Sequence, residues 1–171
     1  MNHNEVARRF NRAFGVSHQT VMIGGAPEPL YVPGERTGGA AQGGRSIIRY
    51  REDFTLSALH EVAHWCIASR QRRRCRDYGY WYSPPPRHEA AQQSFFAAEV
   101  RVQALESLFA ATIGVRFRVS ADNVGTSSTG FAEAVVRAAC EIESAGLSLR
   151  ANQFRTALLR TGNSDGSSVS H

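Results

Sequence analysis

The sequence predicts an α+β fold in which a small β-sheet packs against several helices, one of them a metal-binding helix with an HExxH motif. Three observations support this prediction. Short runs rich in β-branched residues lie in the first third of the chain, and longer segments with helical spacing of apolar residues fill the rest. One of these helical segments contains the HExxH motif. The 171 residues suit a single domain.

The first third of the chain alternates between one helix and short strands. Val6, Phe10 and Phe14 are spaced four residues apart, which predicts a helix over residues 4–14. Strands are predicted at three places, over residues 20–23, 29–32 and 46–51. Residues 34–45 carry five glycines and no phosphate-loop motif, so they predict a flexible loop and argue against a nucleotide site.

The remaining elements are mainly helical. A strongly amphipathic helix is predicted from Asp53 to about Arg70, with Asp53 or Thr55 as its N-cap. Three prolines at 84–86 exclude a helix at the end of the aromatic stretch before them. Further elements are expected in this order: a long helix over 88–113, a short extended piece over 115–119, and helices over 132–144 and 151–159.

Composition excludes several classes of protein. The mean hydropathy is −0.33, and no run approaches the roughly 18 apolar residues that span a bilayer. The first ten residues are polar and lack the apolar stretch of a signal peptide. Cys66, Cys75 and Cys140 are odd in number and form no CxxC pair, which indicates reduced thiols. We therefore expect a cytoplasmic protein without a membrane partner.

The net charge is +5, and every one of the 20 basic residues is arginine. Without lysine the chain has no side-chain amine for Schiff-base catalysis. A basic balance suits nucleic acid, and it equally suits an acidic protein.

The segment from Leu59 to Trp65 reads LHEVAHW and contains the HExxH motif. On a helix, His60 and His64 stand one turn apart on the same face, where two imidazoles can bind one metal ion. Glu61 follows His60 directly and is placed to serve a metal-bound water.

A third ligand must come from elsewhere in the chain. The downstream candidates are His88, Glu89, Glu99, Glu106 and Asp122. Glu99 is preferred because it shares a helical face with Phe96 and Gln103, and a carboxylate on a core-facing stripe usually meets a cation. Two histidines and one carboxylate suit catalytic zinc and non-haem iron(II) equally, so spacing leaves the metal open.

Two further clusters lie between the candidate ligands. Residues 77–82 read DYGYWY, which suits a core strand or the wall of a pocket that holds a cationic side chain. Five arginines follow the HExxH helix closely, and they suit a solvated helix end or a docking surface for an acidic macromolecule: Arg70, Arg72, Arg73, Arg74 and Arg76.

Taken together, these segments resemble the bacterial elongation factor P hydroxylases. Residues 57–68 resemble the family's SALHExxHWCIA segment, residues 77–82 its D[FY]GYWY stretch, and residues 99–106 its VExKPQALEW helix. Weaker likeness continues at residues 28–33 and 120–123. The chain departs from the pattern at three places: Pro84-Pro85-Pro86 replaces PDG, Phe95-Phe96 replaces FE, and Val102 replaces the helix proline.

The resemblance implies a metal-dependent monooxygenase that hydroxylates the β-lysylated lysine of elongation factor P. It places His60, His64 and Glu99 on the metal-ligand positions and gives Glu61 a catalytic role beside them. It further implies Fe(II) as the metal and molecular oxygen as cosubstrate, while the electron donor is not identified. The expected partner is elongation factor P, without direct nucleic-acid binding. The residues expected to contact this substrate are Tyr78, Tyr80, Trp81, Tyr82, Gln103, Arg72 and Arg73.

Two alternatives and a domain boundary complete the predictions. An HExxH zinc peptidase would use Glu61 as the general base toward a zinc-bound water. A non-enzymatic adaptor would use the arginines to bind RNA or the ribosome. Residues 1–161 are expected to form one catalytic domain, and the Gly/Ser-rich residues 162–171 a disordered C-terminal tail.

Overall fold

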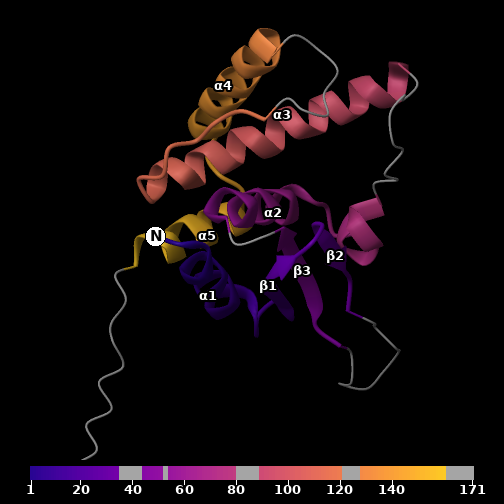
Figure 1. Ribbon diagram of the computed structural model, residues 1–171, viewed down its shortest axis with the longest axis vertical. Coiled ribbons are helices and arrows are strands. Elements are labelled where there is room, and N and C mark those ends of the chain that lie inside the picture. The colour runs from indigo at the N-terminus through magenta and orange to yellow at the C-terminus, as the bar shows by residue number, and fades with distance from the viewer. Residues whose placement is uncertain (35–43, 52–53, 80–88, 121–127, 161–171) are drawn as a thin grey trace, which may run out of the picture.

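The computed structural model describes residues 1–34, 44–51, 54–79, 89–120 and 128–160 (Figure 1). The described part contains five helices and a three-stranded sheet, which confirms the α+β class. Several predictions lie outside the described residues: most of the Gly-rich loop, Asp53 as an N-cap, Tyr80, Trp81 and Tyr82, His88, Asp122, and the C-terminal tail.

The elements follow the predicted order closely. They are α1 (His3–Phe14), β1 (Thr20–Ala26), β2 (Leu30–Val32), β3 (Ser46–Arg51), α2 (Thr55–Ile67), α3 (Glu89–Thr112), α4 (Ser128–Ala145) and α5 (Leu149–Leu159). Two short 3₁₀ turns, Arg72–Arg74 and Arg76–Gly79, follow α2.

One predicted helix cap is wrong, and other segments differ in detail. Thr55 is not the N-cap of α2, because the cap position is Phe54 and makes no side-chain hydrogen bond. Residues 115–119 are not part of a sheet, and residues 77–79 form a tight turn, so the core strand that was one of two interpretations of residues 77–82 is not formed there. β1 continues to Ala26 through Gly24, because glycine leaves room where an added Cβ would lie 2.4 Å from the Tyr50 hydroxyl.

The sheet has the order β1-β3-β2, with β3 in the centre. β3 runs parallel to β1 and antiparallel to β2. Asn11 of α1 pairs with the backbone of Met22 in β1, its Nδ2 donating to the carbonyl and its Oδ1 accepting from the N–H. The Asn11 side chain thus occupies the N–H and carbonyl of Met22, to which a further strand would otherwise bind.

The helices stack in layers on the sheet (Figure 1). α2 lies between the sheet and α3, and α4 packs on the other side of α3. α1 packs against β1, α2 and α5 around an aromatic core, in which Phe10, Phe14, Trp65 and Phe154 are almost fully buried. Seven of the 13 residues of α2 are buried, which makes this helix the centre of the molecule.

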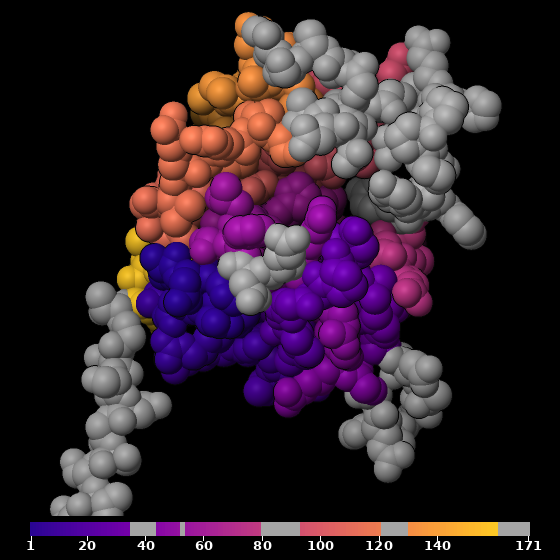
Figure 2. All heavy atoms as spheres, in the orientation of Figure 1, coloured from indigo at the N-terminus to yellow at the C-terminus, as the bar shows by residue number. Residues whose placement is uncertain are grey.

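The space-filling view gives the same picture from outside (Figure 2). Side chains of α1 and the strands form one half of this face, and α3 and α4 form the other half, with α2 between them. None of the described helices is long and apolar enough to cross a membrane.

The C-terminal end of α2 is held by two arginines from other segments. Arg73 Nη1 donates to the Ala68 carbonyl at 2.6 Å, and Arg150 Nη2 of α5 donates to the same oxygen at 2.7 Å. Arg150 Nη2 also lies 2.8 Å from the Cys66 carbonyl. Both guanidinium groups lie over the Trp65 ring, at 5.7 and 5.3 Å from its centroid. The two guanidinium groups therefore donate hydrogen bonds to carbonyl groups at the C-terminal end of α2, where the helix dipole favours positive charge.

Candidate metal centre

The predicted HExxH residues lie on α2, the most enclosed helix of the fold. His60 and His64 are four residues apart, and their Nε2 atoms are 3.1 Å from each other. Their shared face points toward α3, where Glu99, Gln103 and Glu106 are 9%, 3% and 5% exposed. The helical stripe predicted on α3 is thus the face that meets α2.

Glu99 completes a group of three potential metal ligands. Its carboxylate oxygens lie 3.4 Å from His64 Nε2 and 3.8 Å from His60 Nε2. The ligand atoms of these three residues all lie within 4.8 Å of one another. Ligands bonded about 2.1 Å from one metal stand about 3.0–3.4 Å apart in octahedral or tetrahedral coordination. The donor set and its spacing therefore fit a bound divalent metal.

The structure gives Glu106, one of the sequence candidates for the third ligand, a different position. Its carboxylate accepts a hydrogen bond from His60 Nδ1 at 2.8 Å, on the opposite side of the ring from the ligand group. A carboxylate at this position fixes the tautomer of the imidazole and leaves Nε2 for the metal. Glu99 and Glu106 are seven residues apart, which places them on the same face of a helix. This spacing is the signal in the sequence that could have predicted a position near the histidines for both carboxylates.

The acidic surroundings shift the pKa of both His60 and Glu99 in the metal-free protein. Burial alone would lower the pKa of His60, but hydrogen bonding to Glu106 and the neighbouring carboxylates raise it to about 9. Burial would raise the pKa of Glu99, but the hydrogen bond and charge of His64 outweigh it and bring the pKa to about 2. Without metal, the site therefore holds the Glu99 carboxylate beside a His60 that binds its proton tightly. Binding of a metal cation would displace that proton.

Glu61 is 7% exposed and lies next to the ligand group. Burial raises its pKa, against the opposing charges of His64 and His60. Burial therefore favours the protonated form of Glu61 more than water would, and the group lies beside the candidate ligands.

Other predicted site residues occupy positions around the ligands. Tyr78 is 4% exposed, and its ring lies parallel to that of His64 at 6.1 Å between centroids. Gln103 pairs with the backbone of Ser120 through both ends of its amide, at 2.8 and 3.0 Å. Arg72 Nη1 donates to the Tyr78 carbonyl, and Arg73 donates to Ala68 as described above. Their predicted contacts with a substrate stay predictions.

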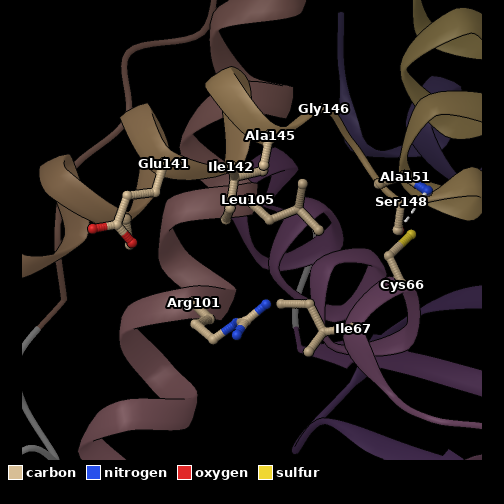
Figure 3. A pocket seen from close by; sticks show the side chains of 11 residues that line it. Cys66, Ile67, Arg101, Leu105, Glu141, Ile142, Ala145, Gly146, Ser148 and Ala151 are labelled. Atoms are coloured by element: carbon tan, nitrogen blue, oxygen red, sulfur yellow. Dashed lines mark hydrogen bonds between the residues drawn. The ribbon is translucent and has the colours of Figure 1, made fainter.

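A separate cavity of about 470 Å³ lies among α2, α3, α4 and the segment leading into α5 (Figure 3). Leu105, Ile67 and Ile142 give it an apolar lining, and Arg101 and Glu141 add charged side chains to that lining. None of the three candidate metal ligands lines it, so this cavity is distinct from the metal centre.

Comparison with known proteins brings in evidence independent of this geometry. The elongation factor P hydroxylase family matches residues 9–169, nearly the whole chain. The chain belongs to this family. An elongation factor P lysine hydroxylase from Haemophilus influenzae is 36% identical over 153 residues, which cover 88% of this chain and 83% of that protein.

Membership in the elongation factor P hydroxylase family confirms the resemblance inferred from the motifs. It identifies the chain as an enzyme of the hydroxylase class, and neither match names a peptidase or an adaptor. The candidate metal site on α2 and α3 accords with a metal-dependent enzyme, because two histidines and one carboxylate can hold a divalent metal and leave coordination positions open.

Proposed function

We propose that this chain hydroxylates a lysine side chain of elongation factor P at a metal held by His60, His64 and Glu99. The single observation that carries the proposal is the convergence of these three ligand atoms within 4.8 Å in a member of the hydroxylase family. The finer substrate that we infer is the β-lysylated lysine, whose long cationic arm the aromatic residues around Tyr78 would receive.

Iron(II) is the metal we propose, with molecular oxygen as cosubstrate. Bound iron(II) would supply the redox chemistry that activates oxygen, and two histidines and one carboxylate leave coordination positions open for it. Insertion of one oxygen atom into a C–H bond, with the other reduced to water, consumes two electrons. An external reductant must deliver these electrons in each turnover.

The chain's own residues would prepare the centre. Glu106 holds the Nδ1 proton of His60, so that Nε2 stays aimed at His64 and Glu99. Glu61, a buried carboxyl group with a raised pKa, would hold and pass a proton beside the ligands. The shell of α2, α3 and the sheet would limit the access of bulk water.

The test is mass spectrometry of β-lysylated elongation factor P after incubation with iron(II)-loaded enzyme and ascorbate. A gain of one oxygen atom in air, and none under nitrogen, is the expected result. Oxygen-18 gas should place the heavy isotope in the product.

Variants separate the proposed hydroxylase from the peptidase mechanism. His64→Ala and Glu99→Ala should lose both metal and activity, whereas His3→Ala, which removes an imidazole outside the candidate ligand group, should retain the metal. Glu61→Gln should keep the metal and a substantial residual rate in a hydroxylase. If no oxygen enters elongation factor P with any reductant, and a protein is instead cleaved in a Glu61-dependent manner without oxygen, the proposal is wrong.

A further inference from the structure

The turn after α2 has an unusual backbone. Asp77, Tyr78 and Gly79 adopt φ values of 47°, 60° and 69°, three consecutive residues in the left-handed region. Glycine accepts this region freely, but Asp and especially Tyr adopt it at a conformational cost. Such a cost persists only where the surrounding structure imposes it, and these positions cluster at functional sites. We call residues 77–79 the left-handed turn.

Strand β2 and the 3₁₀ turn Arg72–Arg74 hold the left-handed turn in place. The Tyr31 N–H of β2 donates to Asp77 Oδ1 at 2.8 Å, and the Tyr31 hydroxyl donates to the Arg73 carbonyl at 2.8 Å. Within the turn, the Tyr78 N–H donates to the Cys75 carbonyl at 3.1 Å, and Arg72 donates to the Tyr78 carbonyl. The turn is thus connected to both the sheet and the segment that follows α2.

The conformation places the Tyr78 ring parallel to two other rings. The Tyr78 ring lies against Tyr31 with 4.3 Å between centroids and 12° between planes. It is also parallel to the His64 imidazole, with 6.1 Å between centroids and 11° between planes. Strand β2 is therefore linked through two flat rings to a candidate metal ligand. Nothing in this arrangement uses the Tyr78 hydroxyl, which is buried and has no hydrogen-bond partner in the described part of the chain.

We propose that the left-handed turn is a positioning element for the metal centre: it holds the Tyr78 ring parallel to His64 and so fixes the orientation of that imidazole. The inference rests on the metal centre of the proposed function. Tyr78 acts through His64, so it is a positioning residue whether or not it also contacts the substrate. The orientation of His64 depends on the Tyr78 ring and on the backbone of the turn, and it does not depend on the Tyr78 hydroxyl.

The test measures cobalt(II) binding to the metal-stripped full chain by competition with a chelator, together with the cobalt absorption spectrum. Tyr78→Phe keeps the ring, and its cobalt affinity should stay close to that of the unaltered chain. Tyr78→Leu should weaken cobalt binding by about tenfold, as loss of a partner that orients a metal ligand typically does. Its cobalt spectrum should change as well.

A second pair of variants tests the backbone of the turn. Asp77→Asn keeps an oxygen acceptor for Tyr31 and tolerates the left-handed region, so it should retain cobalt affinity. Asp77→Ala loses both properties and should weaken binding as Tyr78→Leu does. Phe109→Leu, a buried aromatic replacement in the same core, controls for general destabilisation and should leave the cobalt affinity and spectrum unchanged.

The outcomes distinguish this inference from the proposed function. If Tyr78→Leu and Asp77→Ala bind cobalt with unchanged affinity and spectrum, the positioning role is overturned while the metal centre stands. If His64→Ala and Glu99→Ala retain cobalt, the metal centre itself fails. If Tyr78→Leu does not fold, the contrast between Asp77→Ala and Asp77→Asn decides, and equal affinity in these two variants overturns the proposal.

Discussion

At the scale of single residues, the two ring nitrogens of His60 have different partners. Nδ1 donates to Glu106, while Nε2 faces His64 and Glu99. Removing the Glu106 carboxylate frees the ring to rotate and lowers its basicity toward a metal. We predict that Glu106→Ala weakens metal affinity by about 10–100-fold. Metal competition titration checks it, with the exposed Glu133→Ala on α4 as the control.

Unchanged metal affinity in Glu106→Ala would contradict this prediction and would mean that packing alone orients His60. An intermediate loss in Glu106→Gln is expected, because the amide oxygen still accepts from Nδ1 but carries no charge.

The same contact gives the metal-free protein a distinctive pH dependence. The pKa of His60 rises from 6.5 to about 9 on folding, chiefly through Glu106 against the effect of burial. Protonated His60 therefore stabilises the fold fully below pH 6.5, and this contribution is lost as pH rises through about 9. Urea unfolding of metal-stripped protein across this range should show the decline.

The variant Glu106→Gln isolates this effect from other titrations. It should flatten the alkaline decline, because His60 then gains little on folding as a cation. A decline identical to that of the unaltered chain would show that the contact with Glu106 is not its cause.

Residue types and spacing predicted the three candidate ligands but not the different positions of the two carboxylates. The HExxH motif predicted His60 and His64, and the core-facing stripe predicted Glu99. Glu99 and Glu106 lie on the same stripe, and spacing along one helix cannot say which ring nitrogen each carboxylate meets. That distinction depends on how α3 is positioned lengthwise against α2, which is a tertiary property.

At the scale of elements, the stability of α2 depends on a contact from the far end of the chain. Arg150 of α5 donates to Cys66, in the last turn of α2 with His64, and to Ala68 directly after it. Its hydrogen bonds to backbone carbonyls are charge-assisted, and such bonds contribute about 1.5–3 kcal/mol. We predict that Arg150→Met lowers the free energy of unfolding by about 2 kcal/mol, measured by urea denaturation.

Arg137→Met is the matched control, because Arg137 is exposed on α4 and has no comparable contact with α2. Equal free energies of unfolding for Arg150→Met and Arg137→Met would show that the hydrogen bond from Arg73 to Ala68 is sufficient to stabilise the end of α2. Arg150→Lys should recover part of the loss, since a single ammonium can still donate to Ala68 but lacks the planar stacking over Trp65.

Helices with a regular spacing of apolar residues were predictable from the sequence. The residues at which they begin and end were not. The apolar spacing in α1, α2 and α3 matched the helices to within a few residues. The prediction that α2 is strongly amphipathic is wrong, because this helix lies between the sheet and α3 and is buried on both sides. The start of α2 and the left-handed turn escaped prediction. Phe54 has no capping side chain, and a tyrosine in the left-handed region is imposed by Tyr31 and Arg72, residues that sequence reading does not place beside it.

At the scale of the whole molecule, basic side chains remain available for a macromolecular substrate. Arg70, Arg74 and Arg76 are exposed, unlike Arg73, whose guanidinium is turned toward α2. We predict that replacing these three residues with Ser lowers affinity for elongation factor P by about tenfold at low ionic strength, with the difference shrinking as salt is added. Binding isotherms over a salt series measure this.

Replacement of Arg116, Arg118 and Arg137 with Ser removes the same charge from other exposed positions and should change affinity much less. Equal effects of the two triple variants would indicate that only net charge matters. No effect of either at low salt would reject electrostatic docking through this surface.

The placement of Glu99 and Glu106 on one helix also limits how the chain can change in length. Each residue inserted between them would turn Glu106 about 100° around the axis of α3 and carry it away from His60. Insertions and deletions should therefore be absent between these two positions in relatives that bind the metal. A homologue with a gap there is expected to have lost the reaction even where the HExxH motif is intact.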